Sequence, residues 1–357
     1  MMAHKSMDED EKFREVWLDY EKGLKFNNAI NLNDTVETNE NFFIGKQWEG
    51  VESNGLPTPV FNFLKRVTLF QVASITSDNI KMQTSPLAAA ANDEALSRMT
   101  DIVNAEFDSL FELNKISIML REFMRNAAVD SDGCTYTYWD PEAETGQAAK
   151  GAIITEIVEN TRVFFGNPND RHVQKQPYII IARREMAEDV RERAGHNGLG
   201  GEGIRPDSDD RNNNMDALVD DKVTVLLKLW KDRKTGTIHG CECTRSAMVR
   251  EEWDLGLKRY PITWLNWDYV QDCYHGQALM TGLIPNQIFI NKLFAMSMIS
   301  LMTTAYPKII YDRTRIPKWT NQVGAVIGVN GGNINTAAKI IDPAAISPQI
   351  SQFIELA

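Results

Sequence analysis

The segment from Gln277 to Thr304 constrains this chain most, because apolar side chains surround nearly its whole circumference when it is drawn as one helix. Such a helix is buried on all sides, either by its own fold or by other subunits. Pro285 falls inside it and predicts a kink. Its most apolar part, Leu293–Met302, is ten residues long, whereas a bilayer requires about 20. The sequence therefore predicts a long packed helix and not a membrane span.

The overall charge limits the partners of the chain. Its 357 residues include 38 Lys and Arg against 49 Asp and Glu, a formal net charge of −11. A general nucleic-acid coat needs many cationic phosphate contacts, so that class is excluded, while a local basic patch stays open. Four cysteines are too few for a disulfide scaffold, and the N-terminus lacks the apolar run of a secretory signal. These features predict a reduced, intracellular protein of two or three structural units.

Hydrophobic periodicity predicts an α+β fold. Apolar residues three or four apart predict a helix over 8–26 that buries Phe13, Val16, Trp17, Tyr20 and Leu24. Further helices are expected over 61–82, 93–129 and 184–194, and the second of these would bury Ile102, Phe107, Leu110, Phe111, Leu113, Ile116 and Leu120. Alternating patterns predict strands at 134–139, 152–159, 162–165, 177–182, 222–231, 239–244, 247–253 and 306–311. The polar run 27–41 is expected to be a connector, 195–215 a flexible linker, and 231–236 a hairpin tip.

Motifs for catalysis are absent from the sequence: neither G-x-x-x-x-G-K-[ST] nor G-x-S-x-G occurs. In a strand, Cys241 and Cys243 would share a face, and Cys273 with His275 could complete a zinc site; reduced thiols in a sheet are the alternative. Asp130-Ser-Asp132-Gly opens like a calcium loop, but Pro141 stands at position twelve, which needs an acid. We expect no catalytic residue, metal or cofactor, although an active site assembled from distant residues stays open.

Two short basic segments stand out against the acidic whole. The segment 306–319 contains four basic residues and a single acid, which gives it a net charge of +3. The basic residues are Lys308, Arg313, Arg315 and Lys318. This segment is either a strip that contacts phosphates or a solvated loop. Lys231, Arg233 and Lys234 lie on the predicted hairpin tip, which suits either partner docking or plain solvation. Trp253, Trp264 and Trp267 could stack bases, but core or interface packing is the expected role.

Three groups of short motifs follow one another along the chain. The first is Asn41-Phe-Phe-Ile-Gly-Lys-Gln-Trp48 with Pro57, Pro59 and Asn62-Phe-Leu-Lys-Arg66. The second is Phe165-Gly-Asn-Pro-Asn-Asp170 with the strand after it and Arg183-Arg184. The third is Tyr274-His-Gly-Gln277 with Pro285-Asn-Gln287, Asn291-Lys292 and Ala305-Tyr-Pro-Lys308. In this order, over residues 40–357, they resemble the portal protein of a tailed bacteriophage of the podovirus-like type.

The resemblance implies a structural protein and not an enzyme. Portal proteins form a ring, usually of twelve subunits, at one capsid vertex, and double-stranded DNA passes through it during packaging and ejection. The resemblance therefore implies four kinds of partner besides DNA and further copies of the chain: the terminase, tail adaptor proteins, and the coat and scaffolding proteins. It places the protein in the virion, and in the host cytoplasm during assembly. Two alternatives stay open: another head–tail adaptor or structural virion protein, and a DNA-processing enzyme.

The family's parts can be carried over to this sequence as expectations. The wing would be 1–194, followed by the linker 195–215, a β-rich clip at 216–272, a stem helix at 273–305 and a return to the wing at 306–357. The resemblance implies that Lys308, Arg313, Arg315 and Lys318 face DNA and that Lys231, Arg233 and Lys234 dock the terminase or adaptors. The expected subunit interface comprises Ile288, Leu293, Phe294, Met298 and Met302. Portals of this type normally continue into a tunnel loop and a crown, so either the sequence lacks a C-terminal part or the resemblance covers only the front of a longer architecture.

Overall fold

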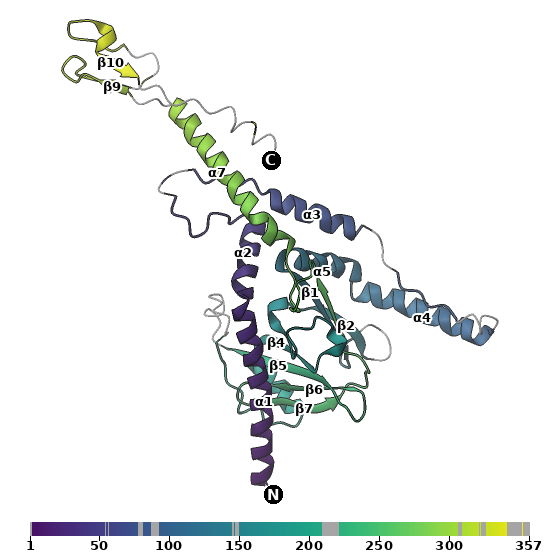
Figure 1. The fold of residues 1–357 in the computed structure, drawn as a ribbon. Coiled ribbons are helices and arrows are strands. Elements are labelled where there is room, and N and C mark those ends of the chain that lie inside the picture. Colours follow the sequence, from purple (N-terminus) through teal and green to yellow (C-terminus); the bar gives the residue numbers. More distant parts are fainter. Residues whose placement is uncertain are drawn as a thin grey trace. The chain divides into compact units, whose positions relative to one another are not determined.

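The computed structural model describes residues 2–53, 55, 57–77, 81–86, 93–144, 146, 150–208, 221–305, 309–320, 322, 326–340 and 352 (Figure 1), with the backbone alone at 2–11, 303–305 and 340. The fold is mixed α+β, as predicted. The chain divides into two compact units. Unit 1 combines Met1–Ile44 with Leu64–Gly282, and unit 2 combines Gly45–Phe63 with Leu283–Ala357. Both units are thus built from separated stretches of sequence.

The largest sheet of unit 1 is five-stranded and antiparallel. Its order is β3 (Val163–Phe165), β4 (Tyr178–Met186), β5 (Lys222–Lys231), β6 (Ile238–Cys243) and β7 (Met248–Asp254). The apolar run Ile179–Ile181 in β4 is buried at every position, because both faces of the sheet are covered. Strands β4 and β5 pair from Tyr178 opposite Trp230 to Met186 opposite Lys222. The linker predicted at 195–215 therefore does not separate two folded units, since the strands on either side of it share one sheet.

A second, three-stranded antiparallel sheet has the order β2 (Ala152–Ile157), β1 (Asp132–Asp140) and β8 (Ile262–Asn266). Its apolar side chains, such as Tyr136 and Ile262, share a core with Ile179 and Leu229 of the large sheet. Two 3₁₀ turns, η2 (Asn160–Arg162) and η3 (Val173–Lys175), flank β3 and β4. One face of the large sheet is thus closed by the small sheet.

Helix α1 (Met2–Ala29) closes the other face of the large sheet (Figure 1). Phe13, Val16, Trp17 and Tyr20 are buried against Ile180, Leu226 and Cys243, with Leu24 partly buried beside them, so the predicted apolar stripe is confirmed. Gly23 lies against the ring of Phe164, where an added Cβ would come within 2.5 Å of Cδ1. The close approach of the helix to the sheet therefore requires glycine at this position.

The connector predicted at 27–41 is wrong, because helix α2 (Leu32–Ile44) occupies most of it. Asn31 separates α1 from α2 with a φ of 52°, a conformation that Asn tolerates. The polar composition hides a narrow buried face formed by Leu32, Asn39 and Phe43. Asn39 Nδ2 donates to the carbonyl of Val129 at 2.8 Å. Tertiary contacts of this kind outweigh local propensity.

Three helices follow: α3 (Phe63–Ile75), α4 (Glu94–Leu113) and α5 (Ile116–Asp130). The helical block predicted over 93–129 consists of two helices that separate at Asn114, whose side chain also bonds the carbonyl of Ile153 (2.9 Å) and the N–H of Thr155 (2.8 Å) in β2. The next residue, Lys115, takes a φ of 50°. The extension of α3 to residue 82 is also wrong, since 81–86 is not helical.

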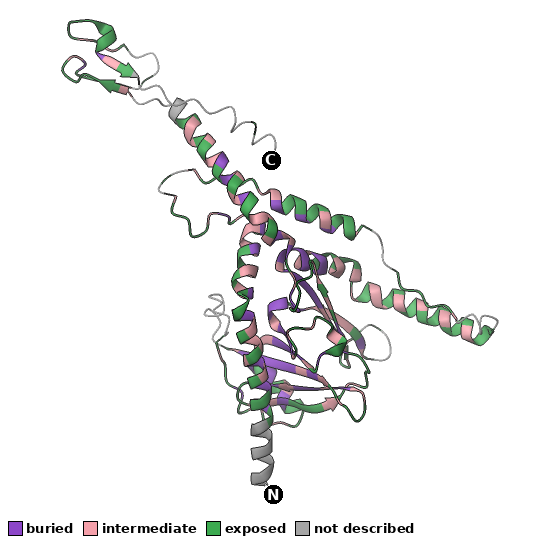
Figure 2. Cartoon of the chain, in the orientation of Figure 1, coloured by how far each residue is buried: buried purple, intermediate pink, exposed green. Residues whose placement is uncertain are grey.

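Helix α4 has no buried residue (Figure 2). The prediction of a buried side is therefore wrong for this helix, and Ile102 is 69% exposed. By contrast, α5 buries Phe123, Met124 and Ala128 against Val72 of α3. Among the apolar residues of α4, Phe107, Leu110 and Phe111 are half-buried, and Met99, Ile102 and Val103 are exposed.

Helix α6 (Ala187–His196) leads into the first half of the predicted linker. There Ile204 is buried in a cluster with Val190 and Val223. The Arg184 guanidinium pairs with the Asp207 carboxylate and donates to the Asp207 carbonyl at 2.9 Å. The prediction of a flexible linker is thus wrong for 197–208, and residues 209–215 lie outside the described part.

Most of helix α7 (Leu279–Ala305) belongs to unit 2, and the predicted long helix is confirmed with Pro285 inside it. The strands β9 (Ile309–Tyr311) and β10 (Ala338–Ile340) pair antiparallel, with the 3₁₀ turn η5 (Ile334–Thr336) directly before β10. Residues 306–308 of the predicted strand lie outside the described part.

Candidate functional site

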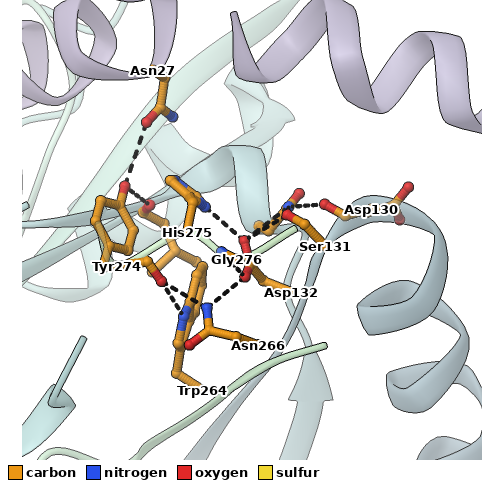
Figure 3. Close-up of polar contacts among 11 residues, drawn as sticks. Asn27, Asp130, Ser131, Asp132, Trp264, Asn266, Tyr274, His275 and Gly276 are labelled. Atoms are coloured by element: carbon orange, nitrogen blue, oxygen red, sulfur yellow. Dashed lines mark hydrogen bonds and ion pairs between the residues drawn. The ribbon is translucent and has the colours of Figure 1, made fainter. Parts of the chain in front are cut away.

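The most polar part of the core surrounds the carboxylate of Asp132 (Figure 3). Its Oδ1 accepts from Asn266 Nδ2 (2.7 Å) and from the backbone N–H of Gly276 (2.8 Å). Its Oδ2 accepts from Ser131 Oγ (2.9 Å), lies 2.7 Å from His275 Nδ1 and lies 3.3 Å from Asn160 Nδ2. The carboxylate is fully buried, so these donors replace the water that it loses on folding.

Local sequence explains how this network is placed. Helix α5 ends at Asp130, and Ser131 turns the chain into β1 with a φ of 87°. Asp132 is then the first residue of the strand, and Asn266 is its direct neighbour on β8. An added Cβ on Gly276 would lie 2.6 Å from the carbonyl oxygen of Asp268, so only glycine fits beside the network.

His275 has a structural role in this network. Its Nδ1 forms a buried polar contact with Asp132 Oδ2 at 2.7 Å. Its Nε2 is buried and has no hydrogen-bond partner among the described residues. Ser131 donates to Asp132 and not to His275, so these three residues lack the serine–histidine contact of a catalytic triad. The network ties β1, β8 and the segment 274–276 together.

Aromatic rings surround the same segment. Tyr274 is stacked on Phe26 (5.7 Å between centroids) and on Phe165 (4.5 Å), and its hydroxyl donates to the carbonyl of Val163 at 3.1 Å. Trp264 Nε1 donates to the carbonyl of Tyr274 at 3.0 Å. Trp253 packs partly buried against the same core, and Trp267 against the α3–α5 cluster. The predicted packing role of the three tryptophans is confirmed.

Asp130 lies at the edge of the network beside a second group of charges. Arg125 pairs with Glu40 at 2.5 Å and lies 3.6 Å from Asp130 Oδ2. Burial and the nearby charge of Glu40 nevertheless raise the pKa of Asp130 to about 8, against the opposing effect of Arg125. The other oxygen, Oδ1, has no partner among the described residues. The carboxyl is therefore held in a place that favours its neutral form.

This shift gives a pH-dependent prediction. The Asp130 carboxyl ionises near 3.8 when unperturbed, so between about pH 4 and pH 8 the unfolded chain has lost a proton that the folded chain keeps. Its contribution to stability therefore falls as pH rises through this window. We expect Asp130→Asn to be more stable than the wild type at pH 8, by on the order of 1 kcal/mol, and to match it near pH 4. Urea denaturation at both pH values measures this. Asp101→Asn, on the exposed face of α4, should keep the wild-type pH dependence.

A chain of side-chain amides joins distant segments inside unit 2. Gln287 Nε2 donates to the carbonyl of Phe61 (2.7 Å) and to Asn291 Oδ1 (3.0 Å), while its Oε1 accepts from the N–H of Phe63 (3.2 Å). Asn291 Nδ2 in turn donates to Gln47 Oε1 at 2.6 Å. Gln47, Gln287 and Asn291 are all buried. These bonds hold the segment 45–63 along α7. Apart from the motifs themselves, no sequence pattern indicates them.

The apolar circumference of α7 is only partly covered by its own chain. Leu293 is buried and Phe294 stacks on Phe61 with 4.1 Å between centroids, so the interface prediction is wrong for Leu293, whose surface is used inside the chain. Ile288 is half-buried. Met298 and Met302 are exposed, as are the following residues on the same helix: Phe289, Met296 and Leu301. Apolar side chains thus remain exposed at several positions around the helix.

The basic segment after α7 contains one structural arginine. Arg315 donates to Thr336 Oγ1 (3.0 Å) and to the carbonyls of Gly331 (3.1 Å) and Asn333 (2.8 Å). Its guanidinium closes the loop between β9 and β10, and its expected contact with DNA stays a prediction. Arg313 and Lys318 are exposed, and Lys308 lies outside the described residues.

The hairpin tip between β5 and β6 is confirmed. The Asp232 carboxylate accepts from the N–H (3.0 Å) and the hydroxyl (3.1 Å) of Thr235, and Gly236 completes the turn with a φ of 74°. The backbone donors of Thr235 and Lys234 lower the pKa of Asp232. Lys231, Arg233 and Lys234 all project exposed from this ordered turn.

The cysteines of β6 behave as core residues. Cys241 and Cys243 share the face packed on α1, as the strand spacing predicts, and burial raises the pKa of the Cys241 thiol to about 11. His239 lies 2.8 Å from Glu252 through Nδ1. Among the described residues, no group of three or more His, Cys, Asp or Glu side chains could hold a metal ion.

A cavity of about 350 Å³ lies between α1 and the large sheet. Tyr178, Trp230, Cys241 and Met248 form part of its lining, and Lys12 is at its rim. Lys228, which also lines it, already pairs with Asp19 at 2.7 Å. With its thiol protonated at neutral pH, Cys241 is a poor nucleophile, so the cavity offers mainly apolar surface.

Within the described part of the chain, no helix has both the length and the hydropathy that a membrane crossing requires. No protein-family model matches the sequence. The search of curated proteins likewise gave no match.

Proposed function

We propose that the chain is the portal protein of a tailed bacteriophage, a ring-shaped DNA conduit at one capsid vertex. The amide chain of unit 2 carries this proposal. Gln47 comes from the first motif of the resemblance, and Gln287 and Asn291 come from the third, yet they bond one another directly. If the motif matches were due to chance, residues from separate motifs would not be expected to contact one another. Their contact supports one architecture behind the separate motifs.

The exposed apolar residues of α7 support the ring. Met296, Leu301 and Met302 are about half exposed, so covering each of them by a neighbouring subunit would contribute half of the ~1.5–3 kcal/mol that full burial gives. In this proposal α7 is the stem helix, and twelve copies surround the channel. Arg313, Arg315 and Lys318 are the described candidates for contact with DNA. A net charge of −11 suits a channel that DNA must leave, because uniformly basic walls would retain it.

The hairpin tip is the proposed docking site for the terminase and, later, for tail adaptors. Its three basic side chains are exposed on a turn that Asp232 holds in place. Such a preformed loop binds a partner without a large loss of conformational entropy. Coat and scaffolding proteins complete the partners, and the virion is the proposed location.

Electron microscopy in negative stain, with light scattering on the same sample, tests the proposal. We expect rings with a central hole and a mass near twelve times 40.4 kDa, about 485 kDa. Leu301→Asp should abolish the rings, because it places a charge in the proposed interface, whereas Asn286→Asp, exposed and polar on the same helix, should preserve them. A monomer at every concentration would overturn the proposal. Rings that form only with another virion protein would favour a head–tail adaptor.

A further inference from the structure

Helix α3 presents an exposed face of mixed chemistry. Its inner side is buried through Leu64, Thr68 and Val72. On the opposite side Arg66, Phe70 and Ala73 follow at spacings of four and three residues, so they form one stripe along the helix. Phe70 is 73% exposed, the largest value for any aromatic side chain among the described residues. Such an exposed phenylalanine marks a surface that another molecule covers.

Helix α4 presents a matching stripe with the opposite charge. Met99, Ile102 and Glu106 follow at spacings of three and four residues and share one side of the helix. Met99 and Ile102 are 63% and 69% exposed. None of the side chains of α4 is buried. The helix is acidic, because it carries one basic residue, Arg98, and four further acids: Glu94, Asp101, Asp108 and Glu112.

The two stripes match when the helices run antiparallel. Arg66 then lies opposite Glu106, Phe70 opposite Ile102, and Ala73 opposite Met99, because the spacings of four and three residues reverse together. Each stripe covers seven residue steps, about 10 Å of helix. Neither Arg66 nor Glu106 has an ion pair in the part of the chain that the structure describes. Apolar contact and charge complementarity therefore coincide in one register.

Both helices are anchored in their own chain in ways that keep the stripes free. Thr68 Oγ1 lies 3.3 Å from Met280 Sδ, and Val72 packs on Phe123, so the inner side of α3 is fixed. At the end of α4, Asn114 is bonded to β2, and Asn104 Oδ1 accepts from the N–H of Thr84 at 2.7 Å. Closing α3 onto α4 within one chain would break these contacts.

We propose that the α3 stripe of one copy of the chain binds the α4 stripe of a second copy. Because the two surfaces differ, the contact is head-to-tail, and repetition leads to a closed ring or an open filament. The inference deepens the proposed function, since a portal ring needs such an interface. Its test below does not require that the ring closes.

Disulfide trapping tests the register directly. Phe70→Cys in one chain and Ile102→Cys in another are mixed under mild oxidation, both in a Cys273→Ser background, because the other three cysteines are buried. We expect a covalent dimer of twice 40.4 kDa that contains one copy of each variant. Asp108→Cys, exposed on the other side of α4, is the matched control and should cross-link at least tenfold less with Phe70→Cys.

Charge reversal tests the ion pair in the same assay. Arg66→Glu added to the Phe70→Cys chain should lower the cross-linking yield about tenfold, because like charges then meet. Glu106→Arg added to the Ile102→Cys chain should restore it. Equal cross-linking of the control, or an internal disulfide in a monomeric Phe70→Cys/Ile102→Cys chain, would overturn the inference. Rings that form without the cross-link would contradict this interface but not the portal proposal. The cross-link without rings would support the interface and contradict the portal proposal.

Discussion

Asp132→Ala should lower the free energy of unfolding of unit 1 by about 3–5 kcal/mol, because each buried donor left without an acceptor costs about 1–3 kcal/mol. The substitution leaves the side chains of Asn266 and Ser131 and the N–H of Gly276 without their shared acceptor, and His275 without its polar partner. Ser131 and His275 are buried, whereas Asn266 and Gly276 are half-buried. Urea denaturation followed by tryptophan fluorescence measures the loss, and Trp264 reports on the site itself.

Asp140→Ala is the matched control, at the other end of the same strand. Its carboxylate accepts from the exposed N–H of Glu142 at 3.0 Å. Its removal should cost less than about 1 kcal/mol. Equal losses for the two variants would show that Asp132 is not the centre of the network. Asp132→Asn should fall between them, because the amide keeps one acceptor oxygen but places a donor against the remaining N–H groups.

Gln287→Leu should release the segment 45–63 from α7 and cost about 2–4 kcal/mol, because it leaves several buried groups unsatisfied. The carbonyl of Phe61, the N–H of Phe63 and the side chain of Asn291 each lose a partner. Hydrogen exchange of the amides in 57–63 measures the effect locally. We expect their exchange to rise by at least tenfold.

Asn286→Leu makes the same chemical change one residue away on an exposed position of α7. It should leave the exchange of 57–63 unchanged. Equal exchange rates of 57–63 in the two variants would show that the amide chain does not hold the segment. The contact between the motifs would then no longer support the proposed function. Ring formation by each variant, observed in the microscope, links this local contact to assembly.

The sequence was most informative where periodicity is strong and burial is on both faces. Strand β5 has the predicted bounds, Lys222–Lys231, and the stripe of α1 is the predicted one. Prediction failed at α2, whose short buried face is diluted by Asn, Asp and Glu. It also missed the break at Asn114, where two long-range hydrogen bonds to β2 accompany the end of a helix. In both cases the deciding contact comes from a distant part of the chain.

The polar network shows the same limit for the candidate site. The sequence patterns place Asp132 in a segment that opens like a calcium loop and His275 in a possible zinc site, and neither pattern indicates a contact between the two residues. They are 143 residues apart, and nothing local indicates that they meet as a buried pair. The signal that could have found them is the position of a charged residue at the exact junction of a helix and an apolar strand.

The two-part construction of unit 2 also governs the order in which the protein can fold. Gln287 follows Phe61 by 226 residues, so at 5–20 residues per second the ribosome needs roughly 10–45 s to supply the partner of this segment. Unit 1 can form its sheets earlier, because their last strand in chain order, β8, ends at Asn266. Unit 2 therefore matures last. In the interval Phe61 stays exposed on the nascent chain, where a chaperone can hold it until α7 emerges.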